Sequence, residues 1–139
     1  MVGNRGWKGS TKNTLQSGGM LGAKWWSKGD VIGCLFQRTF NTKYGEGYEF
    51  TLVSPQSLKV FVDEFGTTTK TGPGDEKTLT RFALPSLNGF EMAVQDMMTE
   101  GFLGFQAFDK VTITCVDILP ATESGYSDMP MFEITVDPR

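Results

Sequence analysis

The chain contains no histidine among its 139 residues. Histidine is the usual general base near neutral pH and a common zinc ligand, so its absence excludes the catalytic triads and metal sites that depend on imidazole. Two adjacent carboxylate pairs, Asp63–Glu64 and Asp75–Glu76, flank a loop rich in Gly and Thr. A metal-dependent nuclease needs carboxylates that converge from rigid elements. We therefore expect no enzyme activity, no metal and no cofactor.

Cysteines and long apolar runs are also scarce. The two cysteines, Cys34 and Cys115, each lie within an apolar run of β type. This placement indicates small buried side chains in neighbouring strands rather than a disulfide, because nothing else marks the chain as secreted. No run approaches the ~20 apolar residues of a membrane span, and the first residues lack the hydrophobic core of a signal peptide. We expect a protein without membrane contact, in the cytoplasm, or in the host cytoplasm if it is viral.

The charge is small but unevenly distributed. The net charge is −3: residues 1–28 carry five basic and no acidic side chains, for +5, and the remainder carries eight bases and sixteen acids, for −8. Residues 1–23 are rich in Gly, Ser, Asn and Lys without periodicity, which predicts a flexible basic arm before one domain at 24–139. Such an arm either contacts an anionic polymer or is only a soluble tail.

The rest of the chain predicts a β-rich domain with one helix. Alternating or apolar runs predict five strands, at residues 30–40, 48–53, 57–63, 110–119 and 131–137. A polar loop follows the third strand, and residues 78–84 are expected to pair back as an extra ribbon. Asn88 is the predicted N-cap of a helix that Gly101 ends. Five strands with a helix between the third and fourth fit an OB-fold barrel.

Two segments resemble a known family. Residues 28–52 (KGDVIGCLFQRTFNTKYGEGYEFTL) resemble the first two strands of OB-fold single-stranded DNA-binding proteins, especially divergent phage and viral members. Residues 108–117 (FDKVTITCVD), followed by a loop and FEITVD, resemble the closing strand pair of the same domains. The resemblance implies binding of single-stranded DNA without sequence specificity in replication or recombination. RNA as the ligand and a homo-oligomeric state both remain open.

The first hairpin carries the candidate binding residues. Strict alternation predicts that Phe36, Arg38 and Phe40 share one face of their strand. A cation within a row of rings suits single-stranded nucleic acid, because bases stack on aromatic faces while phosphates contact Arg and Lys. The predicted stacking residues are Phe40, Tyr44, Tyr48 and Phe61, and the predicted phosphate ligands are Arg38, Lys43 and Lys59.

Trp25 and Trp26 form a second candidate. Adjacent residues of an extended segment point in opposite directions, so one indole is expected to plug the barrel and the other to bind a base. The flanking Lys24 and Lys28 favour that role. Alternatively, both rings anchor the arm to the domain.

A different class of function also fits the composition. A non-catalytic structural or adaptor β-barrel, in a virion or on a protein partner, would explain a domain charge of −8. An acidic surface repels phosphates unless its cations are gathered on one face.

Overall fold

The computed structural model describes residues 18–43, 45–53, 56–123 and 128–137. Its elements follow the order β1 (Gly18–Met20), β2 (Val31–Thr42), β3 (Gly45–Leu52), β4 (Leu58–Val62), β5 (Thr68–Thr69), β6 (Asp75–Leu79), β7 (Arg81–Leu84), α2 (Asn88–Thr99), β8 (Lys110–Leu119) and β9 (Met129–Asp137). The predicted β-rich fold with a helix is confirmed. None of the helices in these ranges is long and apolar enough to cross a membrane.

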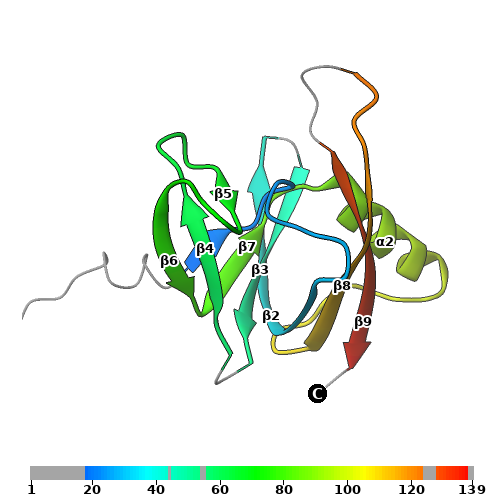
Figure 1. Ribbon diagram of the computed structural model, residues 1–139. Coiled ribbons are helices and arrows are strands. Elements are labelled where there is room, and N and C mark those ends of the chain that lie inside the picture. Colours follow the sequence, from blue (N-terminus) through cyan, green and yellow to red (C-terminus); the bar gives the residue numbers. More distant parts are fainter. Residues whose placement is uncertain (1–17, 44, 54–55, 124–127, 138–139) are drawn as a thin grey trace, which may run out of the picture.

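Six strands form the main sheet, in the order β1-β7-β3-β2-β8-β9. All neighbours are antiparallel except β1 and β7, which run parallel. The sheet curls, with β8 and β9 on one side and β7 on the other, and α2 lies beside β8 and β9 (Figure 1). The sheet is open, with β1 and β9 as its edge strands, so the predicted closure into a barrel is not seen in the described ranges.

The start of the domain lies earlier than predicted. Gly18, Gly19 and Met20 pair with β7, and the Leu21 side chain is fully buried. The assignment of residues 18–21 to a flexible arm is therefore wrong, because this segment forms a sheet edge and fills part of the core. The predicted arm residues before Gly18 lie outside the described ranges.

A second, three-stranded sheet has the order β5-β4-β6 and stands beside β1 and β7 (Figure 1). The predicted third strand, 57–63, corresponds to β4 of this sheet and does not enter the main one. The run 78–84 is divided at Thr80: β6 pairs with β4, whereas β7 pairs with β3. Val60 and Leu79 point inward from the small sheet, are buried and belong to the same hydrophobic core as the main sheet, so the small sheet packs on that core.

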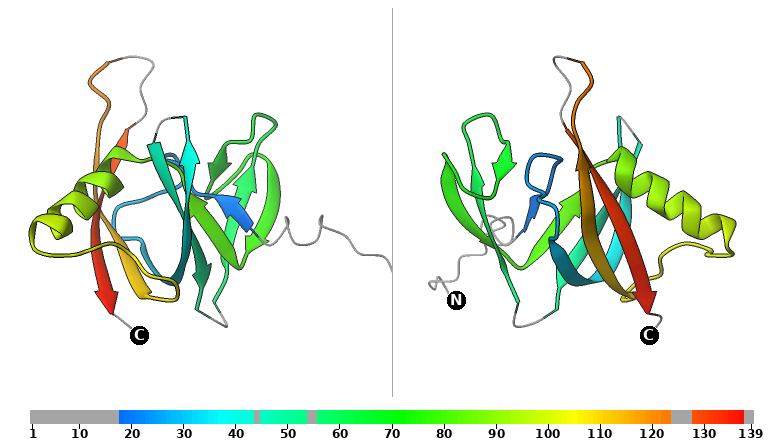
Figure 2. Two further views of the ribbon diagram at one scale, coloured as in Figure 1. Left: turned by 180° about the vertical axis from the view of Figure 1, so that it is seen from behind. Right: turned by 45° about the vertical axis from the view of Figure 1, so that its right-hand side comes forward.

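The helix α2 lies against β8 and β9 of the curled main sheet (Figure 2). Aromatic side chains pack between the helix and the sheet. Phe50 stacks on Phe82 of the neighbouring strand at 5.3 Å between ring centroids. Phe90 enters from α2 and meets Phe132 of β9 at 5.8 Å. Edge-to-face and offset pairs of this kind add to the burial of large apolar surfaces. The helix is thus fixed on the sheet by its own aromatic residue.

The beginning of α2 differs from the prediction. Leu87 is at the N-cap position without a side-chain hydrogen bond, so the assignment of Asn88 as N-cap is wrong. Packing at Gly89, rather than a capping side chain, determines where the first turn of α2 lies. Any side chain at Gly89 would collide with the backbone carbonyl of Pro130, so glycine allows the first turn to approach β9 closely.

Candidate functional site

A β-bulge in β2 determines which side chains of the first hairpin face outward. Phe36 is opposite Phe50, but Arg38 is opposite Glu49, so Gln37 is an extra residue in the ladder. Phe36 and Phe50 are both buried, whereas Arg38 and Glu49 lie on the other face of the sheet. The prediction that Phe36, Arg38 and Phe40 share a face is therefore wrong. A bulge re-aims the side chains that follow it.

Phe40 lies on this outer face, by which we mean the face of β2, β3 and β7 opposite the aromatic core. It is paired with Gly47, and any side chain at Gly47 would collide with the Phe40 ring. The ring therefore covers the glycine and stays only half-buried. The Arg38 guanidinium carbon is 5.8 Å from the centroid of the Phe40 ring. The structure thus brings together one predicted stacking residue and one predicted phosphate ligand.

An ion pair orients Arg38. Its Nε lies 2.8 Å from Oε1 of Glu49, directly across the ladder. The Arg38 side chain is 65% exposed and that of Glu49 only 23%. A guanidinium has five N–H donors, and Nε accounts for one of them. The Glu49 carboxylate therefore fixes the orientation of the Arg38 side chain through Nε, while that side chain remains largely exposed.

A hollow of about 340 Å³ lies beside this ion pair on the outer face. Its floor comes from a row of residues paired across four strands, Arg38–Glu49–Ala83–Met20. Arg81, also on β7, lines the hollow as well. The hollow therefore combines two guanidinium groups and one carboxylate above small or apolar side chains.

Trp25 and Trp26 are not part of this surface. They are 4% and 5% exposed, and their rings meet edge to face at 5.1 Å. The expectation that one indole is available to a base is wrong, and the alternative, that both anchor the chain, describes the structure. Trp26 also packs against Phe132 at 4.8 Å.

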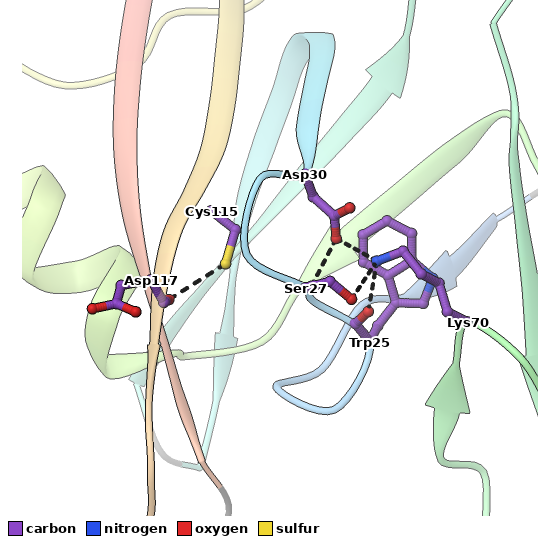
Figure 3. Close-up of polar contacts among 6 residues, drawn as sticks. All are labelled: Trp25, Ser27, Asp30, Lys70, Cys115 and Asp117. Atoms are coloured by element: carbon purple, nitrogen blue, oxygen red, sulfur yellow. Dashed lines mark hydrogen bonds and ion pairs between the residues drawn. The ribbon is translucent and has the colours of Figure 1, made fainter.

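The cation beside Trp25 is neither of the flanking lysines. Lys70, which follows β5, places its Nζ 3.9 Å from the centroid of the Trp25 ring. The same Nζ donates to the Trp25 carbonyl oxygen at 3.1 Å and to Ser27 Oγ at 3.3 Å, and it forms an ion pair with Asp30 (Figure 3). We call these four residues the Lys70 clamp. It joins the small sheet to the segment that leads into β2.

Tyr48 also belongs to the core. Its side chain is 4% exposed and packs against Phe90 at 5.0 Å and Phe105 at 5.7 Å. Burial raises the pKa of its hydroxyl well above the ordinary range, and a hydrogen bond with Glu91 raises it further. The prediction that Tyr48 stacks on a base is wrong, because the alternation of β3 directs it inward with Phe50.

The remaining predicted residues lie in separate places. Lys43 is exposed next to the turn between β2 and β3, and Tyr44 lies outside the described ranges. Lys59 and Phe61 lie on the outward face of β4 in the small sheet, where Lys59 is 3.7 Å from Glu76. Of the eight predicted residues that the structure describes, Arg38 and Phe40 are found in contact with each other on the candidate surface.

The cysteines have no role at this site. Cys34 and Cys115 are free and fully buried on the neighbouring strands β2 and β8, as predicted. Burial raises the pKa of the Cys34 thiol to about 12. Burial is also the main cause that raises the pKa of the Cys115 thiol, and the nearby Asp30 carboxylate raises it further. Both side chains are therefore protonated and unreactive at neutral pH.

The Asp63 carboxylate has a structural role in a turn. Asp63 Oδ1 accepts hydrogen bonds from the backbone N–H groups of Phe65 and Thr67, both at 2.9 Å, and so closes the turn after β4. Within the part of the chain that the structure describes, no cluster of three or more Cys, Asp or Glu side chains is suited to hold a metal ion.

Sequence reasoning missed three residues that matter here: Glu49, Arg81 and Lys70. Glu49 follows Tyr48 and precedes Phe50, so the alternation already placed it on the opposite face from the rings. Arg81 also lies in an alternating run, where it is on the opposite face from the buried Phe82. No signal in the sequence links Lys70 to Trp25, because the two are 45 residues apart.

Comparison with known proteins provides no relative for this arrangement: no family model, no curated protein and no solved structure matches the chain.

Proposed function

We propose that the protein binds single-stranded DNA without strong sequence preference, on the outer face of β2, β3 and β7, during replication or recombination. The observation that carries the proposal is the contact between Arg38 and Phe40 beside a hollow that Arg81 also lines. Bases stack on an aromatic face, and phosphates are neutralised by nearby guanidinium groups. No catalytic step is part of the proposal.

We further propose that the main sheet is an OB-type arrangement. In this proposal β2, β3, β7, β8 and β9 take the places of the five OB strands, with α2 between the third and fourth and the small sheet inserted before the third. OB-folds bind oligonucleotides on the face of their second and third strands. The corresponding strands are β3 and β7, and these supply Glu49, Arg81 and Ala83 to the hollow.

The local charge supports this choice of surface in an acidic protein. Two arginines and one glutamate line the hollow, which gives this region a local charge of +1 within a chain of net charge −3. Cations gathered on one face permit phosphate binding even where the net charge is negative. Nine of the sixteen acidic residues lie within residues 88–137, the part of the chain with α2, β8 and β9, where Lys110 is the one basic residue.

Fluorescence anisotropy of a labelled oligothymidylate tests the proposal. An oligonucleotide of about 12 nucleotides falls within the roughly 4–16 that one OB-fold covers. We expect it to bind more tightly than a duplex of the same length, and we expect its affinity to fall as the salt concentration rises. Equal affinity for both forms, or no binding at low salt, would refute the proposal.

A second candidate is a non-catalytic adaptor that binds a protein. It is favoured by apolar side chains that are exposed away from the hollow, namely Phe65, Leu103 and Phe108. Phe108 is held there with a positive φ of 70°, which is rare for a bulky residue. If the oligothymidylate does not bind, this second function becomes the better interpretation of the fold.

A further inference from the structure

We propose that the hollow is a subsite for a single unpaired guanine base, with Glu49 as the residue that selects it. The proposal rests on the proposed function, since the base is presented by a bound single strand. The subsite would prefer one base at one position, whereas the stacking and phosphate contacts of the rest of the surface do not depend on sequence.

The charges of the hollow indicate a base rather than a phosphate. Glu49 lies on β3, between the strands of Arg38 and Arg81: it is directly opposite Arg38, whereas Arg81 is opposite Thr51, two residues further along β3, and all three residues line the hollow. A phosphate seated against Glu49 would be repelled by that carboxylate, whereas the exposed Arg38 side chain can still meet a phosphate at the rim of the hollow. A ligand that carries hydrogen-bond donors for the glutamate and acceptors for the arginines is complementary to all three groups.

Guanine is the base whose edges match this set. It presents two adjacent donors, N1–H and the N2 amino group, and two acceptors, O6 and N7. An ionised carboxylate has two oxygens that only accept, so it can receive both donors at once. Cytosine and adenine offer a single exocyclic amino group to the carboxylate, and thymine offers one ring N–H. The arginines can donate to O6 and N7, which is the commonest specific contact to guanine.

The shape of the hollow allows a flat ligand to lie against the sheet. Gly19 and Ala83 contribute almost no side chain, and Met20 adds a soft apolar edge. The volume of about 340 Å³ is at the lower end for ligand sites, which fits one base rather than a larger molecule. Phe40 remains beside Arg38 on the same face to stack a neighbouring base.

The experiment compares oligothymidylates of about 12 nucleotides that differ at one central position. The probes carry thymine, guanine, hypoxanthine, adenine or cytosine there. A single guanine avoids the assembly of guanine-rich strands. We expect the guanine probe to bind about 5- to 160-fold more tightly than the all-thymine probe, the range for one bidentate base contact. Hypoxanthine lacks only the N2 amino group, so it should lose most of this preference.

Glu49→Gln provides the matched test on the protein side. The amide keeps the shape of the side chain but replaces one acceptor oxygen with a donor group. We expect this variant to lose the preference for guanine, so that it binds the guanine and hypoxanthine probes equally, whatever its affinity for the all-thymine probe. Glu46→Gln, on the same strand, removes the same charge at an exposed position outside the hollow and should keep the preference.

Equal binding of the guanine and hypoxanthine probes to the unmodified protein, or a preference that survives in Glu49→Gln, would overturn the inference. The comparison of probes on the unmodified protein decides the question even if a variant fails to fold. Tight binding of the all-thymine probe with no preference for guanine would refute only this subsite. Absence of binding to every probe would refute the proposed function itself.

Discussion

Two cation–aromatic pairs in this molecule have opposite surroundings. In the Lys70 clamp, the ammonium is 3.9 Å from the Trp25 ring centroid, the lysine side chain is 33% exposed, and the indole is buried. On the outer face, the Arg38 guanidinium is 5.8 Å from a half-buried Phe40 and is 65% exposed. The first pair joins two segments of the protein, and the second is accessible to solvent.

The difference shows that contact between a ring and a cation is not in itself a sign of nucleic-acid binding. An ammonium group has three N–H donors, and Lys70 has three acceptors within reach, on Trp25, Ser27 and Asp30. Its hydrogen-bonding capacity is used inside the protein. Arg38 forms its ion pair through Nε and extends outward, so only this pair is suited to an external ligand.

The largest expected effect concerns the ring of the clamp. Trp25→Ala should lower the free energy of unfolding by about 3–5 kcal/mol, because it empties a buried aromatic site. Urea denaturation measures the change. The affinity for oligothymidylate per folded molecule should not change. A variant that keeps its stability and loses affinity would reverse the roles assigned to the two pairs.

The cation of the clamp should have the next largest effect. Lys70→Met keeps the alkyl chain and removes the charged hydrogen bonds. We expect a loss of at most about 1.5–3 kcal/mol in the free energy of unfolding, the range for hydrogen bonds to charged groups, reduced by partial exposure. Lys77→Met, at an exposed position of β6 in the same small sheet, is the matched control and should stay within about 0.5 kcal/mol. Equal effects of the two substitutions would show that the clamp contributes nothing specific.

On the outer face, Phe40→Ala should affect binding more than stability. The loss of one stacked base should weaken oligothymidylate binding by about 1–3 kcal/mol. The loss of its contact with Gly47 should cost no more than about 1 kcal/mol of stability, as for other cross-strand pairs. Phe65→Ala removes an exposed ring outside the hollow and should leave affinity unchanged. A Phe40 variant that is destabilised but binds normally would make the outer pair structural too.

The smallest effect is expected in the salt dependence. Arg38→Gln removes one phosphate contact, so the slope of log affinity against log salt should become shallower by about 0.7. Lys110→Gln removes an exposed charge at the start of β8, away from the hollow, and serves as the control. Anisotropy titrations at four or more salt concentrations give both slopes. If they are identical, Arg38 does not contact a phosphate.

The sequence predicted the β-rich composition, the first hairpin, the helix and the burial of both cysteines, because each depends on local periodicity. It failed where the structure depends on one residue out of phase or on distant contacts. Nothing in the sequence marks Gln37 as the bulge, so Arg38 and Phe40 were assigned to the same face as Phe36. The two indoles are buried by Phe132 and Lys70, which are far away in the sequence.

The Arg38–Phe40 pair follows a bulge residue that does not itself line the hollow. Because Gln37 is an extra residue in the ladder, the side chains that follow it in β2 lie on the opposite face from the one that strict alternation from Phe36 predicts. Loss of this single codon would place Arg38 directly after Phe36 and still opposite Glu49, so the ladder would become regular and both Arg38 and Phe40 would stay on the outer face. Deletion of Gln37 should therefore remove the bulge and keep the site. A family of such proteins could gain or lose the bulge residue by insertion or deletion while the site on the outer face stayed the same.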